Sequence, residues 1–314
     1  MTPYLIRRLL QAVATLFIVS IVAFWLLHLM PDGVARGLLG PRATPELIAR
    51  EEHQLGLDRT LVVQYGIWLT KLLHGDLGTS PVYHQSVSAL IGERLGQSAY
   101  LAALALLITV LLAVPVGVLQ ATRAGSLTDH TLTTLSFVGY AVPVFFVGPL
   151  LRDVFQVRLH WVPIANQIDS FHSALIQPEQ LVLPVATLVI GLLAGYSRYV
   201  RSAMLDELTQ DYVRTAVAKG ARGRRVLYRH VLRNAMLPMA TLIGLSLPGL
   251  VGGALLVEQV FNIQGLGWLT VQAAQRDDFA VVLGTTMLTA LATVAGSLLA
   301  DVSYAALDPR VRLT

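Results

Sequence analysis

The sequence predicts an all-α polytopic membrane protein with six transmembrane helices, and composition is the first observation behind that prediction. Of the 314 residues, 13% are charged and 54% hydrophobic, and the mean hydropathy is +0.63. Soluble domains carry about 25% charged residues, so this chain has too little charge to cover a water-facing surface of its size. The same composition excludes a disordered chain.

The second observation is a set of six long apolar stretches that contain no Asp, Glu, Lys or Arg. They predict spans at Leu9–Met30, Ser98–Leu119, Thr131–Leu151, Leu181–Ser197, Leu237–Val257 and Phe279–Ala300. Each stretch approaches the roughly 20 residues that a helix needs to cross a bilayer. Because the stretches are continuously apolar rather than alternating, they favour helices over barrel strands. The first stretch is too long for a signal peptide and lacks a small-residue cleavage site, so we expect a retained span.

The third observation is the distribution of basic residues, which predicts the orientation. With the N-terminus inside, fourteen of the 23 Lys and Arg residues lie on the cytoplasmic side, whereas the short outer loops contain only Arg152, Arg158 and Arg276. An excess of Lys and Arg marks cytoplasmic segments. We therefore expect both termini in the cytoplasm, an extracytoplasmic segment at 31–97 and a cytoplasmic loop at 198–236. Residues 1–314 then form a single transmembrane domain.

Missing motifs exclude several classes of function. The chain has no G-x-x-x-x-G-K-[ST] loop, so we expect no ATP hydrolysis by this polypeptide. It has no cysteine, its eight histidines are scattered and no G-x-S-x-G motif occurs, so neither a metal site nor a serine nucleophile is expected. The apolar spans also lack the charged residues that ion-coupled carriers use. Glu258 and Asp301 fall at span ends, where we expect packing or interfacial roles.

The most informative segment is the loop at 198–236, which contains nine basic and three acidic residues. Its first part predicts a short helix from Asp211, as the N-cap, to a stop at Gly220. The predicted apolar face consists of Tyr212, Val213, Ala216 and Val217. A second amphipathic segment follows, with Val226, Leu227, His230 and Val231 on one side and a stripe of Arg222, Arg225, Arg229 and Arg233 on the other. Two interpretations stay open: a basic loop resting on anionic headgroups, or an elbow that docks on another protein.

Several motifs in this order carry a resemblance to a known family. Asp211-Tyr-Val-Arg-Thr-Ala-Val-Ala-Lys-Gly-Ala and Arg229-His-Val-Leu-Arg-Asn-Ala-Met-Leu-Pro238 resemble the EAA loop of bacterial ABC-importer permeases, most closely in the dipeptide/oligopeptide/nickel branch. The other landmarks of that branch are Tyr4-Leu-Ile-Arg-Arg8, Leu55-Gly-Leu-Asp58, Gly75-Asp-Leu-Gly-Thr-Ser80, Pro143-Val-Phe145, Glu258-Gln-Val-Phe261, Gly265-Leu-Gly267 and Leu307-Asp-Pro-Arg310. Arg214-Thr215-Ala216 replaces the Glu-Ala-Ala of the general motif, a departure that argues against the sugar importers.

The resemblance implies a permease subunit of an ATP-driven importer, in the bacterial inner membrane, that forms half of a pathway for peptides or a related solute. Its partners would be a second homologous permease, two cytoplasmic ATPase subunits and an extracytoplasmic substrate-binding protein, within the lipid bilayer and without nucleic acid. No cofactor is implied for this chain, because the ATPases would bind ATP and Mg. The residues implied to couple it to the ATPase are Tyr212, Arg214, Thr215, Ala216, Ala218, Lys219 and Gly220.

Three questions stay open at this level. Pro248, Gly249 and Gly253 in the fifth predicted span indicate either a gate or plain helix packing. The rival functions are a membrane scaffold that binds anionic lipid and an ion-coupled secondary carrier. The motifs do not distinguish dipeptide, oligopeptide, nickel-chelate and opine cargo.

Overall fold

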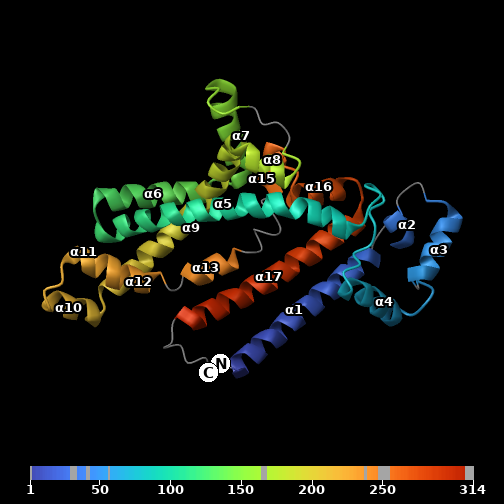
Figure 1. The fold of residues 1–314 in the computed structure, drawn as a ribbon, viewed down its shortest axis with the longest axis horizontal. Helices are drawn as coiled ribbons and strands as arrows, with labels where there is room; N and C mark the ends of the chain where they lie inside the picture. The colour runs from blue at the N-terminus through green and yellow to red at the C-terminus, as the bar shows by residue number, and fades with distance from the viewer. Residues whose placement is uncertain are drawn as a thin grey trace. The chain divides into compact units, whose positions relative to one another are not determined.

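The computed structural model describes residues 2–28, 34–39, 43–55, 57–163, 168–236, 239–246 and 255–307, and every regular element within these ranges is a helix (Figure 1). The chain divides into two compact units. Unit 1 contains residues 1–99, 167–176 and 248–295, and unit 2 contains residues 100–166, 177–247 and 296–314. Helices α5 (Val87–Thr122) and α17 (Phe279–Leu307) each contribute residues to both units.

Four helices among the described residues are long and apolar enough to cross a bilayer. They are Ile6–Leu26 within α1 (Thr2–His28), Val87–Thr122, Pro178–Leu208, and Phe279–Val302 within α17. The third of these joins a short 3₁₀ turn, η2 (Pro178–Leu181), to α9 (Val182–Leu208). The four helices contain the first, second, fourth and sixth predicted spans, apart from the last four residues of the first.

The third predicted span, Thr131–Leu151, is not one straight helix. It bends by 98° between α6 (Leu127–Ala141) and a helical pair formed by α7 (Val144–Arg152) and the π-helix η1 (Asp153–Arg158). The cause is Pro143, since a proline disfavours helical geometry at the preceding residue. Val142 is accordingly extended, with φ −78° and ψ 122°. Counting the bent pair as one span gives five.

The fifth predicted span, Leu237–Val257, lies partly outside the described residues. The structure places α13 (Met239–Leu245) at its start and α15 (Leu255–Phe261) at its end. Pro248, Gly249 and Gly253, the candidate gate residues, fall outside the described part of the chain.

Unit 1 contains α1, the short helices α2 (Val34–Leu39), α3 (Pro45–Leu55), α4 (Leu61–Leu73) and α8 (Phe171–Ile176), then α15 and α16 (Leu266–Gln275), with the first parts of α5 and α17. Its core is a cluster of buried apolar side chains: Val87, Leu90, Ile91, Leu266, Leu269, Ala273, Ala280 and Val281. Helices α5 and α17 approach closely at Gly284, where an added Cβ would lie 2.5 Å from Cγ1 of Val87.

Glu258 is fully buried in unit 1 and serves a structural purpose. Its carboxylate accepts hydrogen bonds from Ser98 Oγ (2.6 Å) and from the backbone N–H of Trp268 (2.9 Å). Ser98 Oγ in turn accepts the N–H of Leu266 (2.7 Å). These bonds satisfy N–H groups that the first turn of α16 leaves without helical partners. The role is one of packing, as its place at a span end predicts.

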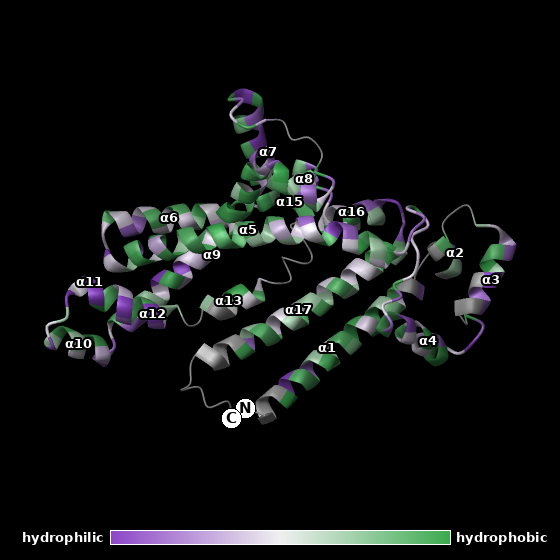
Figure 2. Cartoon of the chain, in the orientation of Figure 1, coloured by the Kyte–Doolittle hydropathy of each residue, from purple (hydrophilic) through white to green (hydrophobic). Residues whose placement is uncertain are grey.

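Unit 2 contains the rest of α5 and α17, the bent pair, α9, and the short helices that follow α9. Helices α5 and α9 are in tight contact, because an added Cβ at Gly117 would lie 2.6 Å from Cβ of Val200. Hydrophobic residues dominate the long helices, whereas polar residues gather on α3 and around α10 to α12 (Figure 2). Exposed apolar side chains lie along α1, α5 and α17, which suits a lipid environment.

Candidate functional site: the helical loop after α9

The loop that follows α9 folds into four short elements. They are α10 (Asp211–Ala218), α11 (Gly223–Arg225), the π-helix η3 (Val226–Val231) and α12 (Leu232–Ala235). Helix α9 continues past Ser197, the predicted end of the fourth span, as far as Leu208. Only Thr209 and Gln210 separate it from α10.

The sequence prediction for the ends of α10 is right at one end and wrong by one residue at the other. The N-cap is Gln210, and Asp211 is the first helical residue, where its charge favours the positive end of the helix dipole. At the C-terminus Gly220 has φ +78°. The N–H of Gly220 donates to Val217 O (2.9 Å) and that of Ala221 to Ala216 O (3.1 Å), which is a Schellman motif. The predicted glycine stop is confirmed.

One face of α10 packs inward and the other is exposed. Val213 is buried, and Tyr212 and Ala216 are half-buried. Val217, predicted on the apolar face, is 58% exposed because it lies at the edge of that face, in the last turn. We call the exposed residues from Arg214 to the glycine stop the α10 face: Arg214, Thr215, Val217, Ala218, Lys219 and Gly220.

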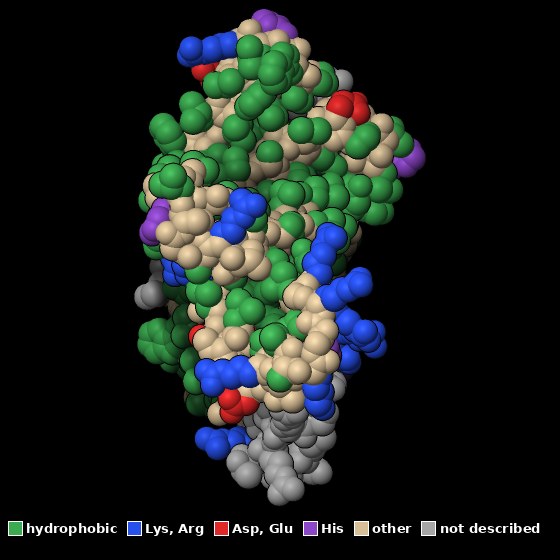
Figure 3. Space-filling view, turned by 90° about the vertical axis from the view of Figure 1, so that its left-hand side faces the viewer, with side chains coloured by type: hydrophobic (Ala, Val, Ile, Leu, Met, Phe, Trp, Pro, Cys, Tyr) green, Lys and Arg blue, Asp and Glu red, His purple; other side chains and the backbone are tan. Residues whose placement is uncertain are grey.

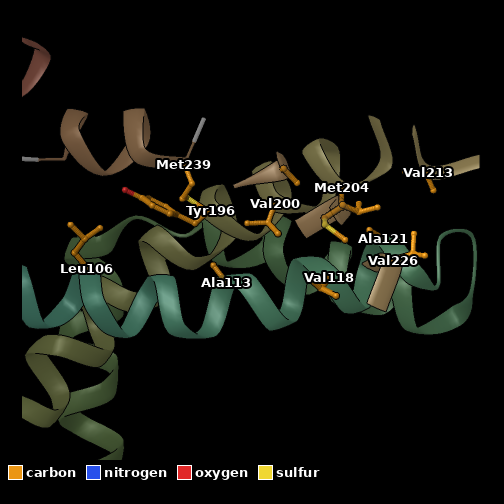
Figure 4. Close-up of a cluster of buried hydrophobic side chains, with 12 residues drawn as sticks. Leu106, Ala113, Val118, Ala121, Tyr196, Val200, Met204, Val213, Val226 and Met239 are labelled. Atoms are coloured by element: carbon orange, nitrogen blue, oxygen red, sulfur yellow. The ribbon is translucent and has the colours of Figure 1, made fainter. Parts of the chain in front are cut away.

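The α10 face is anchored to the long helices by a shared apolar core (Figure 4). This cluster joins Val213 of α10 and Val226 of η3 to side chains of α5 and α9, including Val118 and Met204. Val226 and Val231 are both buried, since the i→i+5 spacing of a π-helix brings residues five apart onto one face. Side-chain packing thus ties α10 and η3 to α5 and α9.

A hydrogen bond adds to this anchor. Tyr212 Oη donates to Glu207 Oε2 near the end of α9 (2.5 Å). Burial, together with this carboxylate, raises the pKa of Tyr212 to about 12. The hydroxyl therefore stays protonated and donating at physiological pH.

The arginines after α10 are exposed, in agreement with the predicted stripe. Arg222, Arg225, Arg229 and Arg233 are all exposed, and so is Arg224. Within the described ranges none of the five forms an ion pair with a carboxylate. Figure 3 shows basic side chains gathered toward one edge of the face to which this loop belongs. Both an anionic headgroup layer and an acidic protein surface suit this charge.

A buried ion pair supports the loop from within unit 2, and sequence analysis did not find it. Arg201 of α9 donates from Nε and Nη2 to the two carboxylate oxygens of Asp129, each at 2.8 Å. Asp129 is 2% exposed and also accepts the N–H of Gly125 (3.0 Å). The pair fastens the α5–α6 turn to α9, ten residues before α10 begins.

Two further observations concern the fifth predicted span and metal binding. Helix α13 approaches α17 closely, because an added Cβ at Gly244 would lie 2.6 Å from Cβ of Ala300. Among the residues that the structure describes, no three His, Asp or Glu side chains lie close enough together to hold a metal ion.

Comparison with known proteins gives two family matches. Residues 113–313 match the model of the binding-protein-dependent transport system inner membrane component, and residues 1–98 match the N-terminal model of the same membrane components. The first match contains the whole loop after α9.

Three curated relatives extend over nearly the entire chain. One is the oligopeptide transport system permease protein AppB of Bacillus subtilis, 37% identical over 99% of both chains. Another is the "Probable peptide ABC transporter permease protein y4tP" of Sinorhizobium fredii, 36% identical over 99% of this chain and 100% of the relative. The third is the glutathione transport system permease protein GsiC of Salmonella typhimurium, 36% identical over 99% of both chains.

Proposed function

Because the chain belongs to the family of binding-protein-dependent transport system inner membrane components, we propose that it forms half of the translocation pathway of an ATP-driven importer for peptides or a related small solute. It is a multi-pass, non-enzymatic membrane subunit. ATP and Mg would be bound by its ATPase partners, and the chain itself needs no cofactor.

The observation that carries the coupling part of this proposal is the exposed α10 face on an anchored helix. Small residues at Ala218 and Gly220 allow another surface to approach the backbone closely. Val213 ties the same helix to the core shared with α5 and α9. An ATPase groove that holds this face could bias a two-state helix bundle only through such a stiff connection. The residues proposed to couple are Tyr212, Arg214, Thr215, Ala216, Ala218, Lys219 and Gly220.

The topology that fits this proposal has six spans and both termini in the cytoplasm of a bacterial cell. Residues 198–236 would face the ATPases, and residues 31–97 would face the extracytoplasmic binding protein. Residues 1–314 form one transmembrane domain, which pairs with a second homologous permease and two ATPase subunits. The names of the relatives refer to peptides, oligopeptides and glutathione, which supports cargo with amide bonds.

Reconstitution tests the proposal directly. The purified chain is assayed for ATP hydrolysis alone, and then with the permease, ATPase and binding-protein subunits encoded beside it, with and without a peptide mixture. We expect no hydrolysis by the chain alone and peptide-stimulated hydrolysis by the full set. Hydrolysis by the chain alone, or a full set indifferent to every peptide, contradicts the proposal.

An uptake assay distinguishes the rival functions. Uptake by an ion-coupled carrier collapses when an ionophore dissipates the gradient at constant ATP. A lipid-binding scaffold supports no uptake at all. We expect uptake that follows ATP and survives the ionophore.

A further inference from the structure

The short helix α4 is held against the end of the first span by polar and aromatic contacts. Tyr65 Oη hydrogen-bonds Ser20 Oγ of α1 (2.7 Å), and Gln64 Oε1 hydrogen-bonds His28 Nε2 (2.9 Å). The ring of Phe24 contacts those of Tyr65 and Trp68, with centroids 5.4 and 5.9 Å apart. One face of α4 is thus fixed on α1.

These contacts place α4 at membrane depth. Ser20 lies six residues before Leu26, the end of the apolar span in α1, which corresponds to about 9 Å at 1.5 Å per residue. The Tyr65 ring also reaches Phe17 (6.1 Å between centroids), a further turn into the span. Because α4 contacts α1 at this depth, we place it within the bilayer rather than in the water above the end of the span.

The exposed surface of α4 is largely apolar. Leu61, Val62 and Leu73 are 53%, 81% and 77% exposed, and Lys71 is the only charged residue of the helix. Thr70 Oγ1 donates to Gly66 O of the same helix (2.7 Å), so its donor is satisfied without water. At 13 residues, or about 20 Å, α4 is too short to cross a bilayer.

The apolar face of α4 is continuous with the lipid-facing surface of the first span. The α1 residues around the contact are themselves exposed and apolar: Phe17, Ile18, Val22, Trp25 and Leu26. Polar residues stand at both ends of α4, with Arg59 and Thr60 before it and His74 and Asp76 after it. Tyr and Trp are enriched where a chain meets the headgroup layer. An apolar helix with polar ends and no charged face suits the boundary between headgroups and acyl chains.

We infer that α4 is an interfacial membrane helix, with Leu61, Val62 and Leu73 in contact with lipid acyl chains beside the end of α1. The segment between the first two spans is then anchored in the bilayer rather than free in water. The inference does not depend on which side of the membrane α4 occupies or on coupling to an ATPase.

Spin labelling of the full chain tests this inference, and the absence of native cysteine removes any background. Single variants Val62→Cys and Leu73→Cys carry a nitroxide. Ile18→Cys on α1 serves as the lipid-exposed reference and Glu52→Cys on α3 as the water-exposed reference. Each protein is reconstituted in vesicles of phosphatidylcholine and phosphatidylglycerol. Collision rates are measured with oxygen, which partitions into lipid, and with a polar nickel chelate present on both sides.

We expect oxygen-to-nickel collision ratios at 62 and 73 that are close to the ratio at 18 and several-fold above the ratio at 52. Ratios equal to that at 52 mean that α4 faces water, which overturns the inference. Suppressed collisions with both reagents mean that protein, either a second copy or another part of the chain, covers the face, and this result also overturns it.

Discussion

Substitution of Gly220 tests the role of the α10 face, because the structure separates steric bulk from backbone strain at this residue. Gly220 has φ +78°, and an added Cβ would meet no heavy atom within 4 Å. A side chain therefore costs the isolated chain no packing. The left-handed conformation itself costs an L-residue about 1–2 kcal/mol, and less for Asn, which adopts it more readily.

Two variants exploit this separation. Gly220→Ala adds strain with little bulk, whereas Gly220→Asn adds bulk with less strain. If an ATPase groove approaches the backbone at Gly220, the bulkier Asn overpacks that contact at a cost of about 1–3 kcal/mol. Such a cost weakens ATPase binding roughly 5- to 150-fold.

The assay is binding of the labelled ATPase subunits to the reconstituted permease, together with peptide-stimulated hydrolysis. We expect Gly220→Asn to impair both more than Gly220→Ala does, while thermal unfolding shows the smaller change for Asn. Gly223→Asn is the matched control, since Gly223 also has open space around it but a φ outside the left-handed region. Two results refute the reasoning. One is a larger loss of ATPase binding and hydrolysis in Gly220→Ala than in Gly220→Asn, and the other is parental ATPase binding by Gly220→Asn.

Substitutions at three places in the fold test its supports by unfolding in detergent. Arg201→Met leaves Asp129 buried without its partner and should destabilise unit 2 by about 3–5 kcal/mol. Asp129→Asn should cost less, because the Arg201 side chain is 30% exposed. A larger loss of stability in Asp129→Asn than in Arg201→Met contradicts the ion-pair account. Gly117→Ala should cost about 1–3 kcal/mol, because the added Cβ overlaps Cβ of Val200 and the backbone oxygen of Ser197; parental stability argues against the close contact. Glu258→Gln should cost about 1–3 kcal/mol, because a Gln side chain has one accepting oxygen and cannot accept both hydrogen bonds that the carboxylate accepts. Parental stability would contradict the role of Glu258 at the start of α16.

The sequence was sufficient to predict the features that depend on local chemistry. The stop at Gly220 follows from a backbone conformation that glycine adopts without cost. Gly75 and Gly78, between the first two predicted spans, have positive φ at turns for the same physical reason. The four continuous spans follow from long apolar runs, whose character does not depend on the rest of the fold.

Features that depend on distant partners could not be predicted in this way. Asp129 and Arg201 are 72 residues apart, and each lies just outside an apolar stretch, where a charge is unremarkable. Val217 fits the helical period of the buried face, but whether a residue at the edge of that face is covered depends on the neighbouring elements. Hydropathy also averages over Pro143, so a window that reads as one span contains a 98° bend.

The segment between the first two predicted spans illustrates the same limit in α4. Its residues are apolar enough to be noticed but too few to span, and composition alone does not say what they contact. The hydrogen bond between Tyr65 and Ser20 supplies that information, because it gives α4 a depth relative to a span.

The central claim is that the α10 face lies in the cytoplasm and is covered by the ATPase. A single Lys219→Cys variant in this cysteine-free chain is exposed to a membrane-impermeant thiol reagent in right-side-out and inside-out vesicles, with and without the ATPase subunits. The account predicts labelling only from the cytoplasmic side, and protection when the ATPases are bound. Labelling from the outer side, or labelling that bound ATPases do not slow, contradicts it.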